Sequence, residues 1–272
     1  MSVSAAEARL IEVLDGYDAL AIAVSGGVDS MTLAYVAHRF SRAGISILHA
    51  VSPAVPAHAT ERVRAYAVQE GWALTVVDAG EFDDPRYRAN PLNRCYYCKS
   101  NLYDRIASSS SDSIASGTNL DDLDDYRPGL LAASERSVVH PFVEAGIDKA
   151  TLRAIASRHG LSDLAELPAQ PCLSSRVETG IGIEPLDLAF IDRMEQAVAK
   201  VVTPGSAVRC RITKAGVALE LAESTSLLCD EASAIASELC RETGRRFLGA
   251  RSYRQGSAFI QINDLAIDHE RL

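Results

Sequence analysis

An apolar run that breaks into a serine- and glycine-containing turn is the feature of this sequence that most constrains its fold. Residues 20–24 have the composition of a buried parallel strand, and residues 25–30 (Ser-Gly-Gly-Val-Asp-Ser) follow directly. Gly26 and Gly27 let the backbone turn tightly and approach an anion. The helix expected over residues 31–40 would direct its N-terminal N–H groups and the positive end of its dipole at a phosphate. The segment therefore predicts a phosphate site between a strand and a helix.

The turn differs from the Walker loop, because it lacks the lysine that reaches the β- and γ-phosphates. Its residues instead resemble the pyrophosphate loop (PP-loop) of the ATP pyrophosphatases, which split ATP between its α- and β-phosphates. An ordinary turn between a strand and a helix is the alternative. The match of consecutive residues in this context favours ATP binding, with the following candidate ligands: Ser25, Gly26, Gly27, Asp29 and Ser30.

Composition limits the class of protein. The 272 residues are 47% hydrophobic and 23% charged, which is typical of a globular protein, and the length suits two domains, over residues 1–165 and 166–272. No apolar run reaches the ~18 to 20 residues of a membrane span, and the N-terminus lacks the pattern of a signal peptide. We therefore expect a cytoplasmic protein without a membrane partner. The net charge of −9 argues against a broad nucleic-acid-binding surface.

The order of apolar segments predicts the architecture. Strands are expected over residues 20–24, 45–51, 73–77, 113–119 and 137–142, alternating with helices over 31–40, 57–70, 102–109 and 149–159. This alternation predicts an α/β fold with a doubly wound parallel sheet, in which ligands bind beyond the carboxyl ends of the strands. Later segments predict a smaller α+β domain: helices over 185–202 and 226–242, a hairpin over 208–221, and strands over 246–252 and 258–262.

A second polar segment is expected at the same edge of the sheet as the first turn. Gly117, Thr118 and Asn119 end a predicted strand and are further candidates for ATP binding. The acidic loop over residues 120–129 follows them. It is either a solvated run of charge or a magnesium site, since hard cations prefer carboxylate oxygen.

The cysteines indicate sulfur or metal chemistry, because disulfides are not expected in a reducing compartment. Cys95 and Cys98 form a C-x-x-C pair, which is compatible with zinc, a redox pair, part of an iron–sulfur cluster, or no function. Cys172 lies alone in a proline-containing connector over residues 168–177. Three thiolates are one short of a closed zinc site. They suit a 4Fe–4S cluster that leaves one iron free of protein, where an exogenous sulfide can bind.

Two arginines alternate onto one face of a predicted strand. The guanidinium groups of Arg209 and Arg211 match carboxylate or phosphate in a bidentate manner. Solvent-facing charges on an edge strand are the alternative. Cys210 lies between them and is expected on the opposite face, whereas Cys229 and Cys240 share one predicted helix and appear structural by position.

Taken together, these stretches resemble the LarE family, ATP-dependent sulfur transferases that build the nickel-pincer nucleotide cofactor. The matching residues lie in both predicted domains: 25–30, 90–99, 117–129, 171–176, 208–211 and 253–257. The resemblance implies adenylation of a carboxylate on pyridinium-3,5-biscarboxylic acid mononucleotide, conversion to a thiocarboxylate, and release of AMP and pyrophosphate. It also implies ATP, Mg²⁺ and a source of sulfide as partners.

The cysteines distinguish two types within this family. Members that sacrifice a cysteine use the position of Cys172 and lack the C-x-x-C pair. Because this sequence has all three residues, it resembles the cluster-containing type, which implies Cys95, Cys98 and Cys172 as ligands of a 4Fe–4S cluster.

The resemblance also implies roles for charged residues. Asp29 is the expected metal ligand, and Lys99 and Arg176 would neutralise a phosphate or carboxylate beside the cysteines. Arg209 and Arg211 would bind the substrate's phosphate. We expect a homo-oligomer.

Three other functions fit parts of the sequence. A tRNA thiolation enzyme can share the loop and the cysteines, but a chain of net charge −9 is a poor ligand for tRNA. A non-catalytic adenine-nucleotide-binding protein needs no cysteine triad, and an amidating ligase that uses ammonia needs none either.

Overall fold

The computed structural model describes residues 2–123, 128–203, 205–222 and 226–253. The strand expected over 258–262 therefore lies outside the described residues. Two compact units are distinguished in the described chain. The first contains the residues up to Tyr87 and Asn93–Gln170, and the second contains Arg88–Leu92 and the residues from Pro171 onward.

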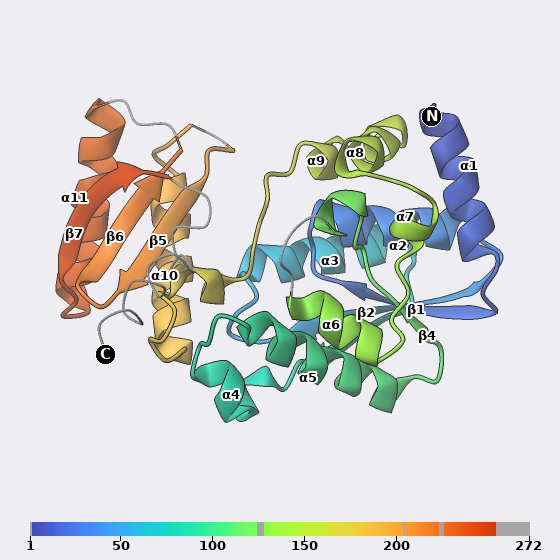
Figure 1. The fold of residues 1–272 in the computed structure, drawn as a ribbon. Coiled ribbons are helices and arrows are strands. Elements are labelled where there is room, and N and C mark those ends of the chain that lie inside the picture. The colour runs from blue at the N-terminus through green and yellow to red at the C-terminus, as the bar shows by residue number, and fades with distance from the viewer. Residues whose placement is uncertain (1, 124–127, 204, 223–225, 254–272) are drawn as a thin grey trace, which may run out of the picture. The chain divides into compact units, whose positions relative to one another are not determined.

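The first unit is built on a parallel sheet (Figure 1). Its strands are β1 (Ala19–Val24), β2 (Gly44–Val51), β3 (Leu74–Asp78) and β4 (Ser113–Ala115), hydrogen-bonded in the order β3-β2-β1-β4. The chain moves outward from β1 to β2 and β3, then returns to place β4 on the other side of β1. This reversal makes the carboxyl end of β1 the topological switch point of the sheet, where open α/β folds bind ligands.

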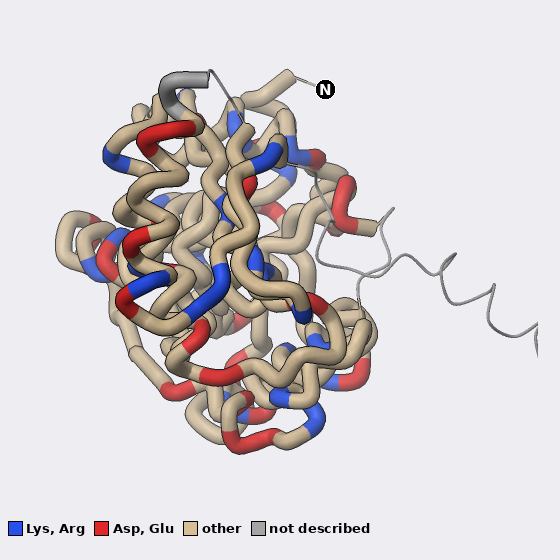
Figure 2. The backbone as a smooth tube through the Cα atoms, turned by 90° about the vertical axis from the view of Figure 1, so that its left-hand side faces the viewer, with Lys and Arg blue, Asp and Glu red and all other residues tan. Residues whose placement is uncertain are grey.

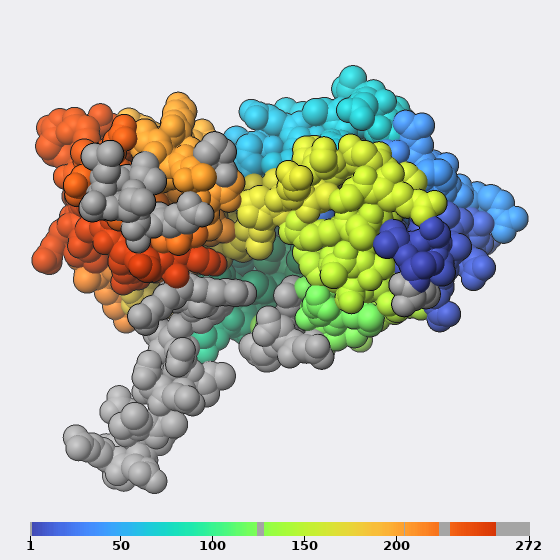
Figure 3. Space-filling model, turned by 90° about the horizontal axis from the view of Figure 1, so that it is seen from above, coloured from blue at the N-terminus to red at the C-terminus, as the bar shows by residue number. Residues whose placement is uncertain are grey.

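Helices cover both faces of this sheet, so the predicted α/β, doubly wound fold is confirmed (Figure 1). The helices from the N-terminus to residue 165 are α1 (Val3–Leu14), α2 (Val28–Phe40), α3 (Ala57–Glu70), α4 (Pro85–Arg88), α5 (Arg94–Ser109), α6 (Pro128–Glu135), α7 (Pro141–Glu144), α8 (Lys149–Arg158) and α9 (Ser162–Ala165), with 3-10 turns η1 (Glu81–Asp83) and η2 (Leu120–Leu123). Figure 3 shows α8 and α9, in yellow-green, beside the dark blue α1 on one face of this unit.

Alternation along β1 separates the two layers of the core. Leu20 and Ile22 are fully buried in a cluster formed mainly with α1, α2 and α8, whereas Ala21 packs on the opposite face with Tyr103 of α5 and Ala133 of α6. Successive side chains of a strand point to opposite faces, so an apolar run is required when helices cover both.

Capping residues set the helix boundaries that the sequence predicts best. Gly71, with φ +69°, ends α3 in the left-handed conformation that favours glycine. Asp148 caps α8, because its carboxylate accepts a hydrogen bond of 2.8 Å from the backbone N–H of Thr151.

Two predictions for the first unit are wrong. The strand expected over 137–142 is reduced to an isolated bridge between Ala115 and Val139, because Pro141 fixes a helical φ and opens α7. Helix α5 begins at Arg94 rather than at residue 102, so the C-x-x-C pair lies on a helix. Residues 94–101 lack glycine and proline, and burial of Arg94 and Ser100 favours helix over the expected loop.

The second unit contains a smaller sheet. β5 (Val208–Thr213) and β6 (Gly216–Leu221) form the predicted antiparallel hairpin, and β7 (Phe247–Ser252) pairs parallel to β6. The unit also contains α10 (Pro185–Ala199), α11 (Ser226–Glu242) and the 3-10 turn η3 (Leu173–Arg176). Cys210 is fully buried and faces away from Arg209 and Arg211, as the alternation predicts.

Two observations concern possible partners. Within the described residues, no helix is long and apolar enough to cross a membrane. In the view of Figure 2, lysine and arginine positions are interspersed with aspartate and glutamate positions.

Candidate functional site

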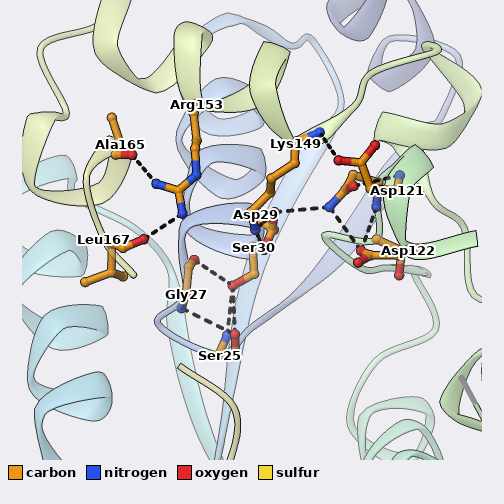
Figure 4. A network of polar contacts seen from close by, with 12 residues as sticks. Ser25, Gly27, Asp29, Ser30, Asp121, Asp122, Lys149, Arg153, Ala165 and Leu167 are labelled. Carbon is orange, nitrogen blue, oxygen red and sulfur yellow. Dashed lines mark hydrogen bonds and ion pairs between the residues drawn. The ribbon is translucent and has the colours of Figure 1, made fainter. Parts of the chain in front are cut away.

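The conformation of the loop between β1 and α2 requires a glycine at position 26 and is stabilised by hydrogen bonds between Ser25 and Ser30. Gly26 has φ +81°, and a Cβ there would lie 2.6 Å from the carbonyl oxygen of Ala59, so only glycine fits. Ser30 Oγ accepts a hydrogen bond of 3.0 Å from the backbone N–H of Ser25 and lies 3.2 Å from Ser25 Oγ (Figure 4). Gly27 is the N-cap of α2 and has no side chain to cap it. The N-terminal N–H groups of α2 can therefore receive an anion.

The second predicted segment lies against this loop. A Cβ on Gly117 would be 2.6 Å from the backbone nitrogen of Ser30, so the chain after β4 directly contacts the start of α2. The nearly buried Asn119 donates from Nδ2 to Asp29 Oδ1 at 3.2 Å. The structure thus brings residues 25–30 and 117–119 together at the switch point, although they are far apart in sequence.

A lysine that sequence reasoning did not assign to the site also lies here. Lys149 Nζ is 2.5 Å from both carboxylate oxygens of Asp29 (Figure 4). Lys149 is the first residue of α8, where the helix dipole disfavours a positive charge. A lysine at this unfavourable position indicates that another interaction holds it there. This was the signal in the sequence from which Lys149 could have been assigned to the site.

Two carboxylates approach the same amide. Asn119 Nδ2 also donates to Asp122 Oδ2 at 3.0 Å, so Asp29 and Asp122 both accept from one nitrogen atom. Carboxylate oxygens suit a hard cation, and Mg²⁺ is usually held by one or two carboxylates together with substrate phosphates and water. Within the described residues, no group of three or more His, Cys, Asp or Glu side chains is placed to hold a metal ion. The residues present therefore fit Mg²⁺ that arrives with phosphate, rather than a site made by protein alone.

The side chain of Thr118 is part of a chain of hydrogen bonds that runs through Ser116 to His140. Its Oγ1 lies 2.9 Å from Ser116 Oγ, which in turn lies 2.8 Å from His140 Nδ1. Burial lowers the pKa of His140, which favours the neutral imidazole. The chain orients the segment that contacts α2.

The C-x-x-C pair lies near the N-terminus of α5 in the first unit. Cys95 and Cys98 are partly exposed, and their spacing of three residues places both on one face of the helix. Two such thiols fit the donor set of an iron–sulfur cluster or of zinc. Lys99 follows on the same helix, with Nζ 6.0 Å from the centre of the Tyr103 ring.

The second unit contains the remaining predicted site residues. Cys172 is exposed, whereas Arg176 is buried and donates from Nε and Nη2 to Glu195, both at 2.9 Å. Arg176 Nη1 also donates to the carbonyl oxygens of Pro171 at 2.6 Å and Cys172 at 3.1 Å. Arg176 thus fixes the backbone that presents the Cys172 thiol.

Arg209 and Arg211 are only 9% and 6% exposed, so the alternative of solvent-facing charges is wrong. Arg211 donates to Glu220 at 2.8 Å and to the carbonyl of Ser175 at 2.7 Å. Burial, and next the charge of Arg176, lower the pKa of Arg209. Several guanidinium groups therefore lie close together in a poorly hydrated region, where the carboxylates of Glu195 and Glu220 pair with Arg176 and Arg211.

Comparison with known proteins shows the family to which this chain belongs. No family model matches the chain. The uncharacterized protein slr1717 of Synechocystis sp. is 40% identical over 182 residues, which are 65% of this chain and 68% of that protein. The chain belongs to the slr1717 family. The uncharacterized protein MJ0830 of Methanocaldococcus jannaschii is 30% identical to this chain over 146 residues, which are 52% of this chain and 56% of that protein.

A more distant relative has a named activity. The pyridinium-3,5-bisthiocarboxylic acid mononucleotide synthase of Lactiplantibacillus plantarum is 26% identical over 208 residues, which are 75% of each chain. That relative is named as a synthase, and the similarity supports an enzymatic function for this chain.

Proposed function

We propose that this chain is an ATP-dependent sulfurtransferase of the LarE type. It would convert a carboxylate of pyridinium-3,5-biscarboxylic acid mononucleotide into a thiocarboxylate. The observation that carries the proposal is the Asp29–Lys149–Asn119 network beside an uncapped helix N-terminus at the switch point of the sheet. The name of the L. plantarum relative supports the substrate class.

The loop supplies the groups that an ATP pyrophosphatase needs. The N–H groups of α2 and the hydroxyls of Ser25 and Ser30 would bind the β- and γ-phosphates. Asp29, with Asp122, would hold Mg²⁺ against phosphate oxygens, and Lys149 would then turn from Asp29 to a phosphate. The ion pair between Asp29 and Lys149 is partly exposed, with 28% and 33% of the side chains accessible, so a ligand can exchange with it.

Two displacements complete the proposed reaction. A substrate carboxylate oxygen attacks the α-phosphorus in line, the P–O bond to the β-phosphate breaks, and pyrophosphate leaves with the bonding electrons. Sulfide then attacks the carbonyl carbon of the acyl-adenylate, the C–O bond to the adenylate breaks, and AMP leaves. Lys149 and the loop N–H groups would stabilise the charge that develops on pyrophosphate.

The second unit would bind the rest of the substrate. Arg209 and Arg211 are proposed to hold its phosphate, since guanidinium groups bind phosphate in a bidentate manner. Lys99 of the first unit is proposed to neutralise the reacting carboxylate. Arg176 would act by holding the backbone at Cys172.

The cysteines would supply the sulfur chemistry. We propose that Cys95 and Cys98 of the first unit and Cys172 of the second hold one 4Fe–4S cluster. When bound by three cysteines, such a cluster offers an iron atom that can accept sulfide.

The decisive experiment uses full-length protein purified without oxygen. With MgATP, sulfide and pyridinium-3,5-biscarboxylic acid mononucleotide, we expect AMP, pyrophosphate and a substrate whose mass shows oxygen replaced by sulfur. Release of pyrophosphate without sulfur in the product would reject sulfur transfer and favour another carboxylate-activating enzyme. Binding of MgATP without pyrophosphate release would indicate a nucleotide-binding protein, and retention of total tRNA on a filter would favour tRNA thiolation.

The cluster is tested separately by iron analysis. Each of Cys95→Ala, Cys98→Ala and Cys172→Ala should lower iron content and stop sulfur transfer while leaving some adenylation. Cys229→Ala is the matched control, because Cys229 is partly exposed but lies on α11. An active, iron-free enzyme with a mass deficit at Cys172 after turnover would instead establish that Cys172 donates its own sulfur.

A further inference from the structure

Helix α3 contacts the end of β1 and the loop that follows it at several points. The backbone of Ala59 packs against Gly26 so closely that a Cβ on Gly26 would clash. Arg62 Nη1 donates a hydrogen bond of 2.7 Å to the carbonyl oxygen of Gly26. The sequence predicts no site residue in the helix over residues 57–70, and these contacts connect α3 to the loop.

A buried histidine makes a second connection between the same elements. His49 of β2 is fully buried, with Nδ1 2.9 Å from the carbonyl oxygen of Val24 and Nε2 2.9 Å from Thr60 Oγ1 of α3. A carbonyl only accepts, so Nδ1 donates and Nε2 accepts from the threonine hydroxyl. Burial lowers the pKa of His49, which favours this neutral tautomer. The last residue of β1 is therefore fixed relative to α3.

The hydrogen bond from Arg62 to the Gly26 carbonyl determines the direction of the Gly27 N–H group. A peptide unit is planar, and the bond between Gly26 and Gly27 is trans, so the N–H of Gly27 points opposite to the Gly26 carbonyl. That N–H lies toward Ser25 Oγ, at an N···O distance of 3.4 Å. This hydrogen bond is long, so a phosphate oxygen can replace it. Arg62 thus binds the carbonyl side of the Gly26–Gly27 peptide, while the N–H of Gly27 on the other side of that peptide faces the interior of the loop.

Arg62 is itself held in position. Its Nη1 also donates to Gln170 Oε1 at 3.2 Å, and the side chain is partly buried on α3. Burial lowers the pKa of Arg62, while the nearby Asp163 opposes that shift. A buried guanidinium with fixed partners keeps its orientation better than an exposed one.

We propose that Arg62 is a positioning residue for the phosphate loop, which fixes the Gly26–Gly27 peptide so that the Gly27 N–H binds the pyrophosphate part of ATP. This inference rests on the proposed function, because it takes a nucleotide pyrophosphate as the ligand.

The test measures binding of MgATP, and separately of magnesium pyrophosphate, by calorimetry on the full-length protein. Arg62→Gln removes the charge-assisted hydrogen bond and should weaken both ligands about tenfold or more. Arg62→Lys keeps a cationic donor and should recover part of the affinity. Gln170→Ala leaves Arg62 in place and should have a smaller effect. Arg64→Gln is the matched control, because Arg64 is an exposed arginine on the same helix.

The results separate this inference from the proposed function. If Arg62→Gln binds both ligands as the wild type does, or if Arg64→Gln loses as much affinity, Arg62 is not a positioning residue. Equal losses in Arg62→Lys and Arg62→Gln, with a lowered thermal midpoint in both, would indicate a purely structural role and also reject it. Wild-type binding of MgATP without pyrophosphate release would reject only the proposed reaction. If the wild type binds neither ligand, both proposals are wrong.

Discussion

The two units use positive charge in different ways. At the switch point of the first unit, the phosphate loop relies on backbone N–H groups and on one partly exposed ion pair, Asp29–Lys149. In the second unit, Arg211 and Glu220 form an ion pair whose side chains are only 7% and 1% exposed. A buried pair loses a charge-assisted hydrogen bond in a poorly solvated place when it is broken, although Glu220 also pairs with Arg251 at 2.9 Å, whereas an exposed pair exchanges partners easily. The first pair can therefore exchange with a ligand, whereas the second fixes the side chain of Arg211, which is proposed to bind the substrate's phosphate.

The largest expected effect comes from breaking the pair in the first unit. Asp29→Asn should reduce AMP and pyrophosphate formation at least about a hundredfold, since a charge needed at the phosphates is lost. The thermal midpoint should change little, because the pair is partly exposed. Lys149→Met should reproduce this pattern. A folded Asp29→Asn variant that forms pyrophosphate normally would remove Asp29 from the mechanism.

Breaking the pair in the second unit should lower stability as well as substrate binding. Arg211→Ala should lower the free energy of unfolding by about 1 to 3 kcal/mol, because Glu220 loses a charge-assisted hydrogen bond but keeps its ion pair with Arg251. Denaturant titration measures the loss. If Arg211→Ala is as stable as the wild type, the pair does not hold the fold.

Arg209 separates binding from stability within the same strand. Arg209→Ala should raise the substrate KM about ten- to a hundredfold with little change in ATP affinity. Steady-state kinetics and calorimetry with ATP check this result. Unchanged substrate binding would show that Arg209 serves the sheet rather than the ligand.

A smaller effect is expected from the contact between the two segments of the first site. Gly117→Ala should cost about 1 to 3 kcal/mol, since the new methyl group would clash with the backbone of Ser30. It should also weaken MgATP, which calorimetry measures. Gly44→Ala is the control, because a Cβ there would meet Ala19 at an ordinary 3.5 Å. Equal stability of the two variants would contradict the close contact.

The smallest expected effect is a dependence of the folding stability on pH that comes from Asp84, which lies outside both sites. Hydrogen bonds from Arg86, and then Asn101, lower the pKa of Asp84 to about 2. A lowered pKa stabilises the fold above the unfolded value of about 4, and this contribution disappears as the pH falls toward about 2. Asp84→Asn should therefore lose at most about 1 kcal/mol at neutral pH and nothing at the acid end. A difference that grows as the pH falls would contradict this assignment.

The sequence predicts the elements whose ends carry their own signals. Helices α3 and α8 were predicted closely because Gly71 and Asp148 mark their ends, and the loop was found because glycine is required by backbone geometry at Gly26. These features depend on local conformation, which nearby residues determine.

Features that depend on packing were not predictable in the same way. The start of α5 depends on burial of Arg94, and the burial of Arg209 and Arg211 depends on chain segments that cover an edge strand. The pairing of Lys149 with Asp29 joins residues far apart in sequence. Periodicity gives the face of an element on which a residue lies, but not what covers that face.

The contacts around Cys172 have a practical consequence. Arg176 donates hydrogen bonds to the carbonyl oxygens of Pro171 and Cys172, which belong to the peptide bonds before and after Cys172. The residue Cys172 itself is exposed. The backbone position thus does not depend on the sulfur atom. Exchange of that atom for oxygen or selenium should therefore leave the backbone in place, so that any change in iron content or sulfur transfer reports on the sulfur atom itself.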